Sequence, residues 1–167
     1  MENIEKLLRS LFAELNARIE ALNLERESDG LFAFPKAKVQ LLGQFSLLVN
    51  KKISTVLSLA HTGDLDALLK MDHSIKIELK KLLAKNGFVY DEDSPLIWIP
   101  EGSKFEEIYD FDHIKIESID SESALVSKAI KARHKNLQLI REAIASDAFP
   151  TLVDRILKHG GRLEDFL

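Results

Sequence analysis

The segment Thr62-Gly63-Asp64-Leu65-Asp66-Ala67-Leu68-Leu69 carries the pattern on which our expectation of the fold rests. Its two carboxylates stand two residues apart before an apolar run, a spacing typical of a β-strand that presents both acids on one face while Leu65, Ala67 and Leu69 point into a core. The carboxylates repel each other by about 2–3 kcal/mol at an effective dielectric of about 20, so a divalent cation or a basic side chain is expected beside them. A turn at Thr62-Gly63 that leads into an exposed acidic pair is the alternative.

The composition is that of an ordinary soluble protein, with 46% hydrophobic and 30% charged residues among 167. We expect one domain over residues 1–167, because that length buries a sizeable core. The net charge of −4 predicts no general affinity for nucleic acid or membranes. Because the chain has no cysteine, thiolate metal sites, disulfides and cysteine nucleophiles are excluded. An acidic amphipathic start and the lack of a long apolar run predict a cytoplasmic protein without a secretory signal or membrane span.

Apolar residues recur at helical spacing in several stretches of the chain. The expected helices are 2–23, 72–86, 121–134, 135–146 and 149–159. Asp72 is a plausible N-cap of the second helix, and Asn86-Gly87 is typical of its C-terminal end. The polar stretch 25–30 is expected to be a loop.

Short apolar runs bounded by Gly, Pro and acidic residues predict strands. The expected strands, besides the acidic segment, are 38–43, 88–90, 96–100 and 114–119. The runs 44–49 and 53–59 fit either a strand or a helix. We therefore expect an α/β (α+β) fold, with a small mixed sheet flanked by helices. Within it, 1–30 is an N-terminal helix and loop, 36–119 the sheet-containing core, and 120–167 a helical segment.

This layout resembles the minimal nucleotidyltransferase fold of the polymerase-beta type, and most of all the bacterial nucleotidyltransferase-like proteins related to abortive-infection toxins of toxin–antitoxin pairs. The resemblance rests on Leu41-Leu42-Gly43 at the end of a short strand, on Thr62-Gly63-Asp64-Leu65-Asp66, and on the step Ser127-Lys128 in a later helix. It covers roughly residues 36–165.

The resemblance implies a site that binds a nucleoside triphosphate with Mg²⁺. By position, Asp64 and Asp66 match the carboxylates that hold the metal ions, and Gly43 matches the glycine beside the triphosphate. The next residue is Gln44, where the family usually has Gly or Ser. A third carboxylate comes from a neighbouring strand in the family, and Glu117 is our first choice, because it alternates with Ile114 and Ile116; Asp112 is the second choice.

Lys128 matches a lysine that lies near the active cleft in the toxin relatives, where it would neutralise developing charge; a solvated lysine is the alternative. Lys131 with Arg133-His134-Lys135 forms a basic cluster that would meet phosphate or RNA, or be a solvated helix face. Of the five histidines, His61 alone stands next to the acidic segment.

We therefore expect a nucleotidyltransferase-fold protein that transfers a nucleotidyl group to a protein or RNA acceptor, with activity that is weak or lost. The alternative is a non-catalytic interaction protein of the same fold, such as one half of a toxin–antitoxin-like pair. A further alternative is a structural protein that forms a homodimer, or binds a partner protein, through the N-terminal helix.

Overall fold

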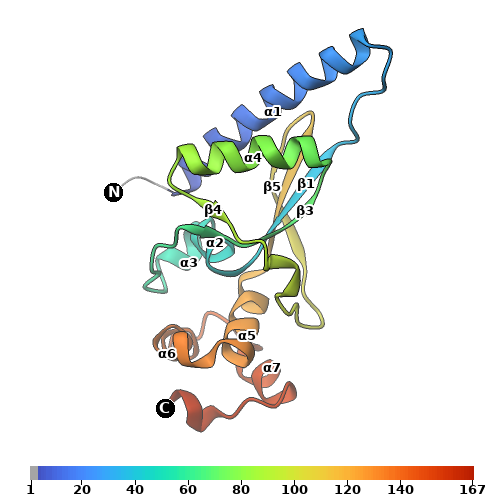
Figure 1. The fold of residues 1–167 in the computed structure, drawn as a ribbon. Coiled ribbons are helices and arrows are strands. Elements are labelled where there is room, and N and C mark those ends of the chain that lie inside the picture. The colour runs from blue at the N-terminus through green and yellow to red at the C-terminus, as the bar shows by residue number, and fades with distance from the viewer. Residues whose placement is uncertain (1–3) are drawn as a thin grey trace.

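The computed structural model describes residues 4–167 and has a mixed α+β architecture (Figure 1). Its central sheet has the strand order β3-β1-β6-β5. The strands are β1 (Ala37–Leu41), β3 (Ala67–Lys70), β5 (Phe105–Asp110) and β6 (Ile114–Ile119). β1 runs parallel to β6, whereas β3 is antiparallel to β1 and β5 is antiparallel to β6. The expected α/β class with a small mixed sheet is confirmed.

A second, two-stranded parallel sheet joins β2 (Asp64–Leu65) to β4 (Val89–Tyr90). The acidic segment is therefore extended, as expected, but it was wrong to expect one strand there. The chain changes partner at Asp66, so that β2 pairs with β4 and β3 pairs with β1. Leu65 and Ala67 are fully buried and Leu69 packs against the same core, as the strand alternation predicted.

The helices fall into two groups (Figure 1). α1 (Ile4–Ser28) and α4 (His73–Lys85) contact each other at one end of the molecule and share a core with the strands. The short α2 (Gly43–Leu48) and α3 (Lys51–Ser54) share a second core with the helices of the C-terminal segment. Those helices are α5 (Ser121–Lys131), α6 (Leu137–Ala145) and α7 (Leu152–Lys158). No helix among the described residues has the length and apolarity to cross a membrane.

Local sequence explains where these helices start and stop. Asp72 caps α4 by accepting a hydrogen bond from Ser74 N, and Gly87 ends it with a φ of +81°. The expected start of the first helix at residue 2 lies outside the described residues. Its expected end was wrong, because α1 continues through the stretch 25–28, whose residues favour helices, and stops at Asp29-Gly30.

The two runs that fitted either a strand or a helix are settled: α2 spans Gly43–Leu48, and the run 53–59 is the end of α3 followed by a turn. Two strands differ from expectation. The strand expected at 96–100 is absent, because Pro95 starts a short 3₁₀ turn at Ser94–Leu96 and Pro100 has no N–H to donate to a ladder. The strand β5 was missed, because a bulge between Glu107 and Tyr109 interrupts its alternation.

Candidate functional site

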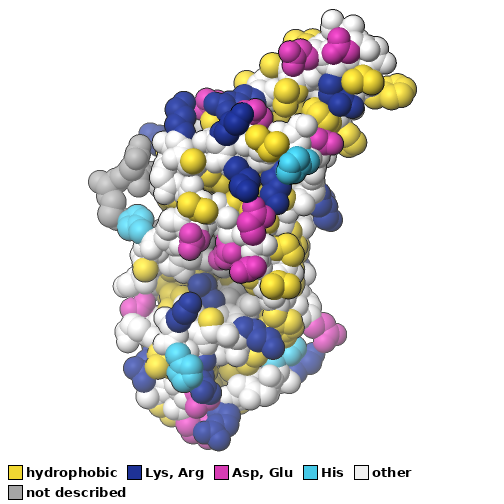
Figure 2. Space-filling view, in the orientation of Figure 1, with side chains coloured by type: hydrophobic (Ala, Val, Ile, Leu, Met, Phe, Trp, Pro, Cys, Tyr) yellow, Lys and Arg dark blue, Asp and Glu magenta, His cyan; other side chains and the backbone are white. Residues whose placement is uncertain are grey.

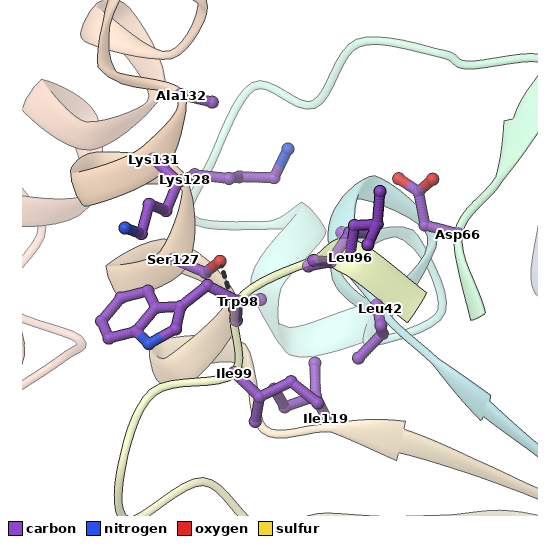
Figure 3. A pocket seen from close by; sticks show the side chains of 13 residues that line it. Leu42, Asp66, Leu96, Trp98, Ile99, Ile119, Ser127, Lys128, Lys131 and Ala132 are labelled. Atoms are coloured by element: carbon purple, nitrogen blue, oxygen red, sulfur yellow. Dashed lines mark hydrogen bonds between the residues drawn. The ribbon is translucent and has the colours of Figure 1, made fainter. Parts of the chain in front are cut away.

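A cleft of about 540 Å³ opens where β1 and β6 end and α2 and α5 begin (Figure 3). Three of the residues singled out by sequence, Gly43, Asp66 and Lys128, lie in its wall, although they come from three separate elements. The other residues that line it are Leu42, Leu96, Ile97, Trp98, Ile99, Ile119, Ala124, Ser127, Lys131 and Ala132.

Gly43 and Asp66 are in direct contact. Leu42 N donates a 2.8 Å hydrogen bond to Asp66 O, which holds the end of β1 against the break between β2 and β3. Gly43 has a φ of +54°, and a β-carbon at this position would lie only 2.6 Å from Asp66 Oδ2. The backbone conformation therefore favours glycine here, and a β-carbon would also displace the Asp66 carboxylate from its present position.

Asp91 joins Asp66 because of the register of the small sheet. Leu65 is paired with Tyr90 in parallel strands, and Asp91 N donates a 2.9 Å hydrogen bond to Leu65 O, so Asp66 and Asp91 follow side by side. The hydroxyl of Ser94 fixes the turn, because it donates to Asp91 O at 2.6 Å and accepts from Ala67 N at 3.1 Å. Sequence reasoning missed this acid, although the acid-rich turn 91–95 was a signal for it.

Burial and the neighbouring carboxyl change the acidity of Asp66. Desolvation comes first, followed by a hydrogen bond with the Asp91 side chain and repulsion from it, and together they raise the pKa of Asp66 to about 6. The positive charge of Lys128 acts in the opposite direction and lowers this pKa. Near pH 6 the Asp66 carboxyl is therefore partly protonated unless a cation binds beside it.

Lys128 extends from α5 toward Asp66 across the cleft (Figure 3). Val126, on the opposite side of α5, is fully buried, and Lys128 therefore lies on the side of the helix that lines the cleft. Desolvation lowers the pKa of Lys128, the charge of Asp66 raises it, and nearby Lys135 lowers it. Among the described residues, Lys128 Nζ has no hydrogen-bond partner and no carboxylate within 4.0 Å. It is thus a half-buried cation without a direct counter-charge.

No family model, curated protein or solved structure matches the chain. What the cleft does must therefore be argued from its own chemistry.

Other residues that the sequence singled out lie away from the cleft. Asp64 is exposed on β2 and does not line it, although its charge still raises the pKa of Asp66 slightly. The Gln44 side chain turns outward, where its Nε2 donates a 2.8 Å hydrogen bond to Ala60 O. Gln44 and the exposed His61 line a separate groove.

The two candidates for a third carboxylate also lie elsewhere. Glu117 accepts a 3.0 Å hydrogen bond from Gln40 Nε2 and lies 3.7 Å from Lys38 Nζ, on a face of the sheet outside the cleft. Asp112 lies in the turn between β5 and β6, at the opposite end of β6. The acid that contacts Asp66 is instead Asp91, which was not among the two candidates.

The basic cluster is divided between different surroundings. Arg133 pairs with Asp165 at 2.8 Å, whereas Lys131 lies over the Trp98 ring with its Nζ 5.5 Å from the ring centroid. On the face seen in Figure 2, acidic side chains gather across the middle and basic side chains lie below them, over the C-terminal helices. Within the cleft itself, Asp66 lies opposite Lys128, and Lys131 belongs to the same helix as Lys128 (Figure 3).

The carboxylates near the cleft limit how many metal ions the site can hold. Among residues 4–167, no group of three or more His, Cys, Asp or Glu side chains is arranged to hold a metal. Asp66 lines the cleft and Asp91 contacts it from outside the lining, so these two would be the residues to hold a single Mg²⁺, which commonly takes one or two carboxylates and completes its shell with water and substrate phosphates. They do not fit the two-ion centre that the family resemblance implies, because such a centre needs bridging carboxylates for both ions.

Proposed function

We propose that this chain is a nucleotidyltransferase-fold protein that binds a nucleoside triphosphate, with one Mg²⁺, in the cleft between α2 and α5. The observation that carries the proposal is the convergence of Gly43, Asp66 and Lys128, three positions that the resemblance selected from separate parts of the sequence, on one cleft. A chance resemblance gives no reason for these positions to meet.

The chain's own residues have distinct roles in this proposal. Lys128 is a cation without a direct counter-charge in a partly desolvated wall, so an anionic phosphate gains a strong electrostatic interaction there. Asp66 and Asp91 would hold the Mg²⁺, which would neutralise the triphosphate and polarise the phosphorus that is attacked. Gly43 lets Asp66 approach the start of α2, because the carboxylate occupies the space that a β-carbon of residue 43 would take.

Binding with little or no transfer is the form of this function that the geometry favours. Asp66 is the only carboxylate among the described residues that line the cleft, and Asp91 contacts it from outside that lining. Asp64 is exposed outside the cleft and Glu117 is engaged with Gln40, so the site has at most these two carboxylates. A weak transferase that acts on a protein or RNA hydroxyl, and a non-catalytic member of a toxin–antitoxin-like or heteromeric pair, both fit this arrangement.

Calorimetric titration with MgATP and MgCTP tests the proposal. We expect binding by the unmodified chain, and at least tenfold weaker binding by Lys128→Gln. Lys52→Gln serves as the control, because it removes the same charge from an exposed lysine outside the cleft. An absence of heat with both nucleotides, in a folded protein, contradicts the proposal.

Transfer is measured separately, by incubating the chain with each labelled nucleoside triphosphate, Mg²⁺ or Mn²⁺, and a cell extract. We expect little or no labelled product. Strong labelling that disappears in Asp66→Asn would show that the chain is a robust enzyme.

A further inference from the structure

The cleft has two chemically different parts (Figure 3). Gly43, Asp66 and Lys128 form a polar end. Trp98, Ile99 and Ile119 lie away from Asp66 and belong to the second apolar core. Because apolar walls penalise any polar group that they leave unpaired, this second part favours a ligand that presents a flat or aliphatic surface.

The two polar side chains in the second part both contact Trp98. Ser127 Oγ donates a 2.7 Å hydrogen bond to Trp98 O, and Lys131 Nζ lies over the Trp98 ring. Apart from Asp66, the described residues that line the cleft include no carboxylate, amide or imidazole side chain. The amide and carboxylate side chains that read the edges of adenine and cytosine are therefore missing from this wall, and its lysine, Lys131, lies over the Trp98 ring.

We infer that the apolar part of the cleft receives the nucleobase of the bound triphosphate through its faces, and that it binds purine and pyrimidine nucleotides without selecting one base. This inference rests on the proposed function and deepens it by naming the substrate class. Stacking and apolar contact tolerate every base, because every base has a π-face, and the polar edge stays in contact with water.

Two physical consequences follow for the ligand. Larger bases bury more apolar surface, so ATP and GTP are expected to bind slightly more tightly than CTP and UTP. Tripolyphosphate, which has no base, reaches only Lys128 and the polar end, so it is expected to bind more weakly than any nucleotide.

The position of the base can be detected directly, because Trp98 is the only tryptophan of the chain. We expect each Mg-nucleoside triphosphate to change the emission of Trp98, and Mg-tripolyphosphate to leave it unchanged at saturation. Calorimetry on the same samples should give four nucleotide Kd values within about fivefold of one another, and a Kd for tripolyphosphate that is at least tenfold weaker.

A pair of matched variants tests the wall itself. Ile99 and Ile144 are both half-buried isoleucines packed on the second core, but only Ile99 lines the cleft. Ile99→Ala should weaken all four nucleotides by about threefold and leave tripolyphosphate binding unchanged. Ile144→Ala should alter neither, and thermal melts check that both variants fold.

The outcomes separate this inference from the proposed function. One nucleotide that binds at least 20-fold more tightly than the others overturns the inference and leaves the proposed function standing. Tripolyphosphate that binds as tightly as the nucleotides does the same. If neither nucleotides nor tripolyphosphate bind, the proposed function is wrong and the inference falls with it.

Discussion

The α-carbon of Gly43 faces the carboxylate of Asp66 so closely that a β-carbon at residue 43 would lie 2.6 Å from Asp66 Oδ2. The missing side chain at residue 43 lets the end of β1 approach the break between β2 and β3, where Leu42 N donates a hydrogen bond to Asp66 O. This contact brings the acid of one segment to the start of α2, and the whole polar end of the cleft depends on it.

Gly43→Ala should therefore lower the free energy of unfolding by about 2–3 kcal/mol, because a φ of +54° and the overlap with Asp66 both disfavour alanine. Urea unfolding measures the change. Gly30→Ala is the matched control, since Gly30 has a φ of +77° but a β-carbon added to it would meet no atom within 4 Å, so about 1 kcal/mol is expected. Equal losses in the two variants would mean that the contact with Asp66 contributes nothing.

The raised pKa of Asp66 predicts an unusual pH dependence. The folded chain binds this proton up to about pH 6, whereas an unfolded aspartate releases it near 3.8, so the folded state holds more protons between these values. Stability from this group is therefore present at low pH and is lost as the pH rises from about 4 to 6. Solvent screening of the half-buried carboxyl limits the effect to about 1 kcal/mol.

Asp66→Asn removes this titration and isolates the effect. The variant should be more stable than the unmodified chain at pH 7, and the difference should vanish near pH 4. Thermal or urea unfolding across this range measures it. A difference that stays constant between pH 4 and pH 7 would show that the Asp66 carboxyl titrates normally in the folded chain.

Sequence periodicity correctly predicted the elements whose form is set by nearby residues. The buried alternation of Leu65 and Ala67 and the capped helix that starts after Asp72 depend on neighbours within a few residues, and both are present. The strand β5 depends instead on pairing with β6 through a bulge, and the change of partner at Asp66 depends on two different sheets. Such long-range choices leave no periodic trace in the sequence.

The same distinction explains the candidate site. Gly43, Asp66 and Lys128 were selected because a resemblance marked their positions, and all three line the cleft. Asp91 was missed because only the parallel pairing of Leu65 with Tyr90 brings it beside Asp66, 25 residues away along the chain. Glu117 alternates along its strand as expected, but it is paired with Gln40 on β1, whose side chain donates a hydrogen bond to it.

Lys128→Met should bind tripolyphosphate at least tenfold more weakly, equivalent to about 1.4 kcal/mol, yet unfold at the same or a higher denaturant concentration. The charged form of this lysine is penalised by burial, which lowers its pKa, so an apolar side chain of similar length removes an unfavourable term. Lys52→Met controls for the change in net charge. A marked loss of stability in Lys128→Met would instead indicate a structural role for the lysine.

The N-terminal helix is predicted to be part of the core rather than an interface. Leu8, Phe12, Leu15 and Ile19 are buried against the sheet and α4 within the same chain. Phe12→Ala should cost about 3–5 kcal/mol, and deletion of residues 1–24 should abolish cooperative unfolding. Leu24→Ser, at a side chain that is 63% exposed, should cost less than about 0.5 kcal/mol. If the full chain sediments as a dimer and the truncated chain still folds but sediments as a monomer, the helix is a dimer interface after all.

Mn²⁺ binding can decide whether Asp91 or Glu117 is the acid that holds a metal ion together with Asp66. The binding is measured by electron paramagnetic resonance at pH 7.5, because this pH lies above the pKa of Asp66, which is about 6. Two carboxylates bind such an ion weakly alone, so the titration is done with a saturating nucleoside triphosphate, whose phosphates complete the shell. We expect Asp91→Asn to weaken Mn²⁺ binding at least tenfold.

Both variants preserve the local hydrogen bonds, which makes the comparison clean. The amide oxygen of Asp91→Asn still accepts from Asp93 N, a bond of 2.9 Å in the unmodified chain, and that of Glu117→Gln still accepts from Gln40 Nε2. Because the Glu117 carboxylate lies outside the cleft beside Lys38, Glu117→Gln should change Mn²⁺ binding by less than twofold. If Glu117→Gln weakens Mn²⁺ binding and Asp91→Asn does not, Glu117 on β6 is the acid that acts with Asp66, and a two-ion centre is favoured over the single ion proposed here.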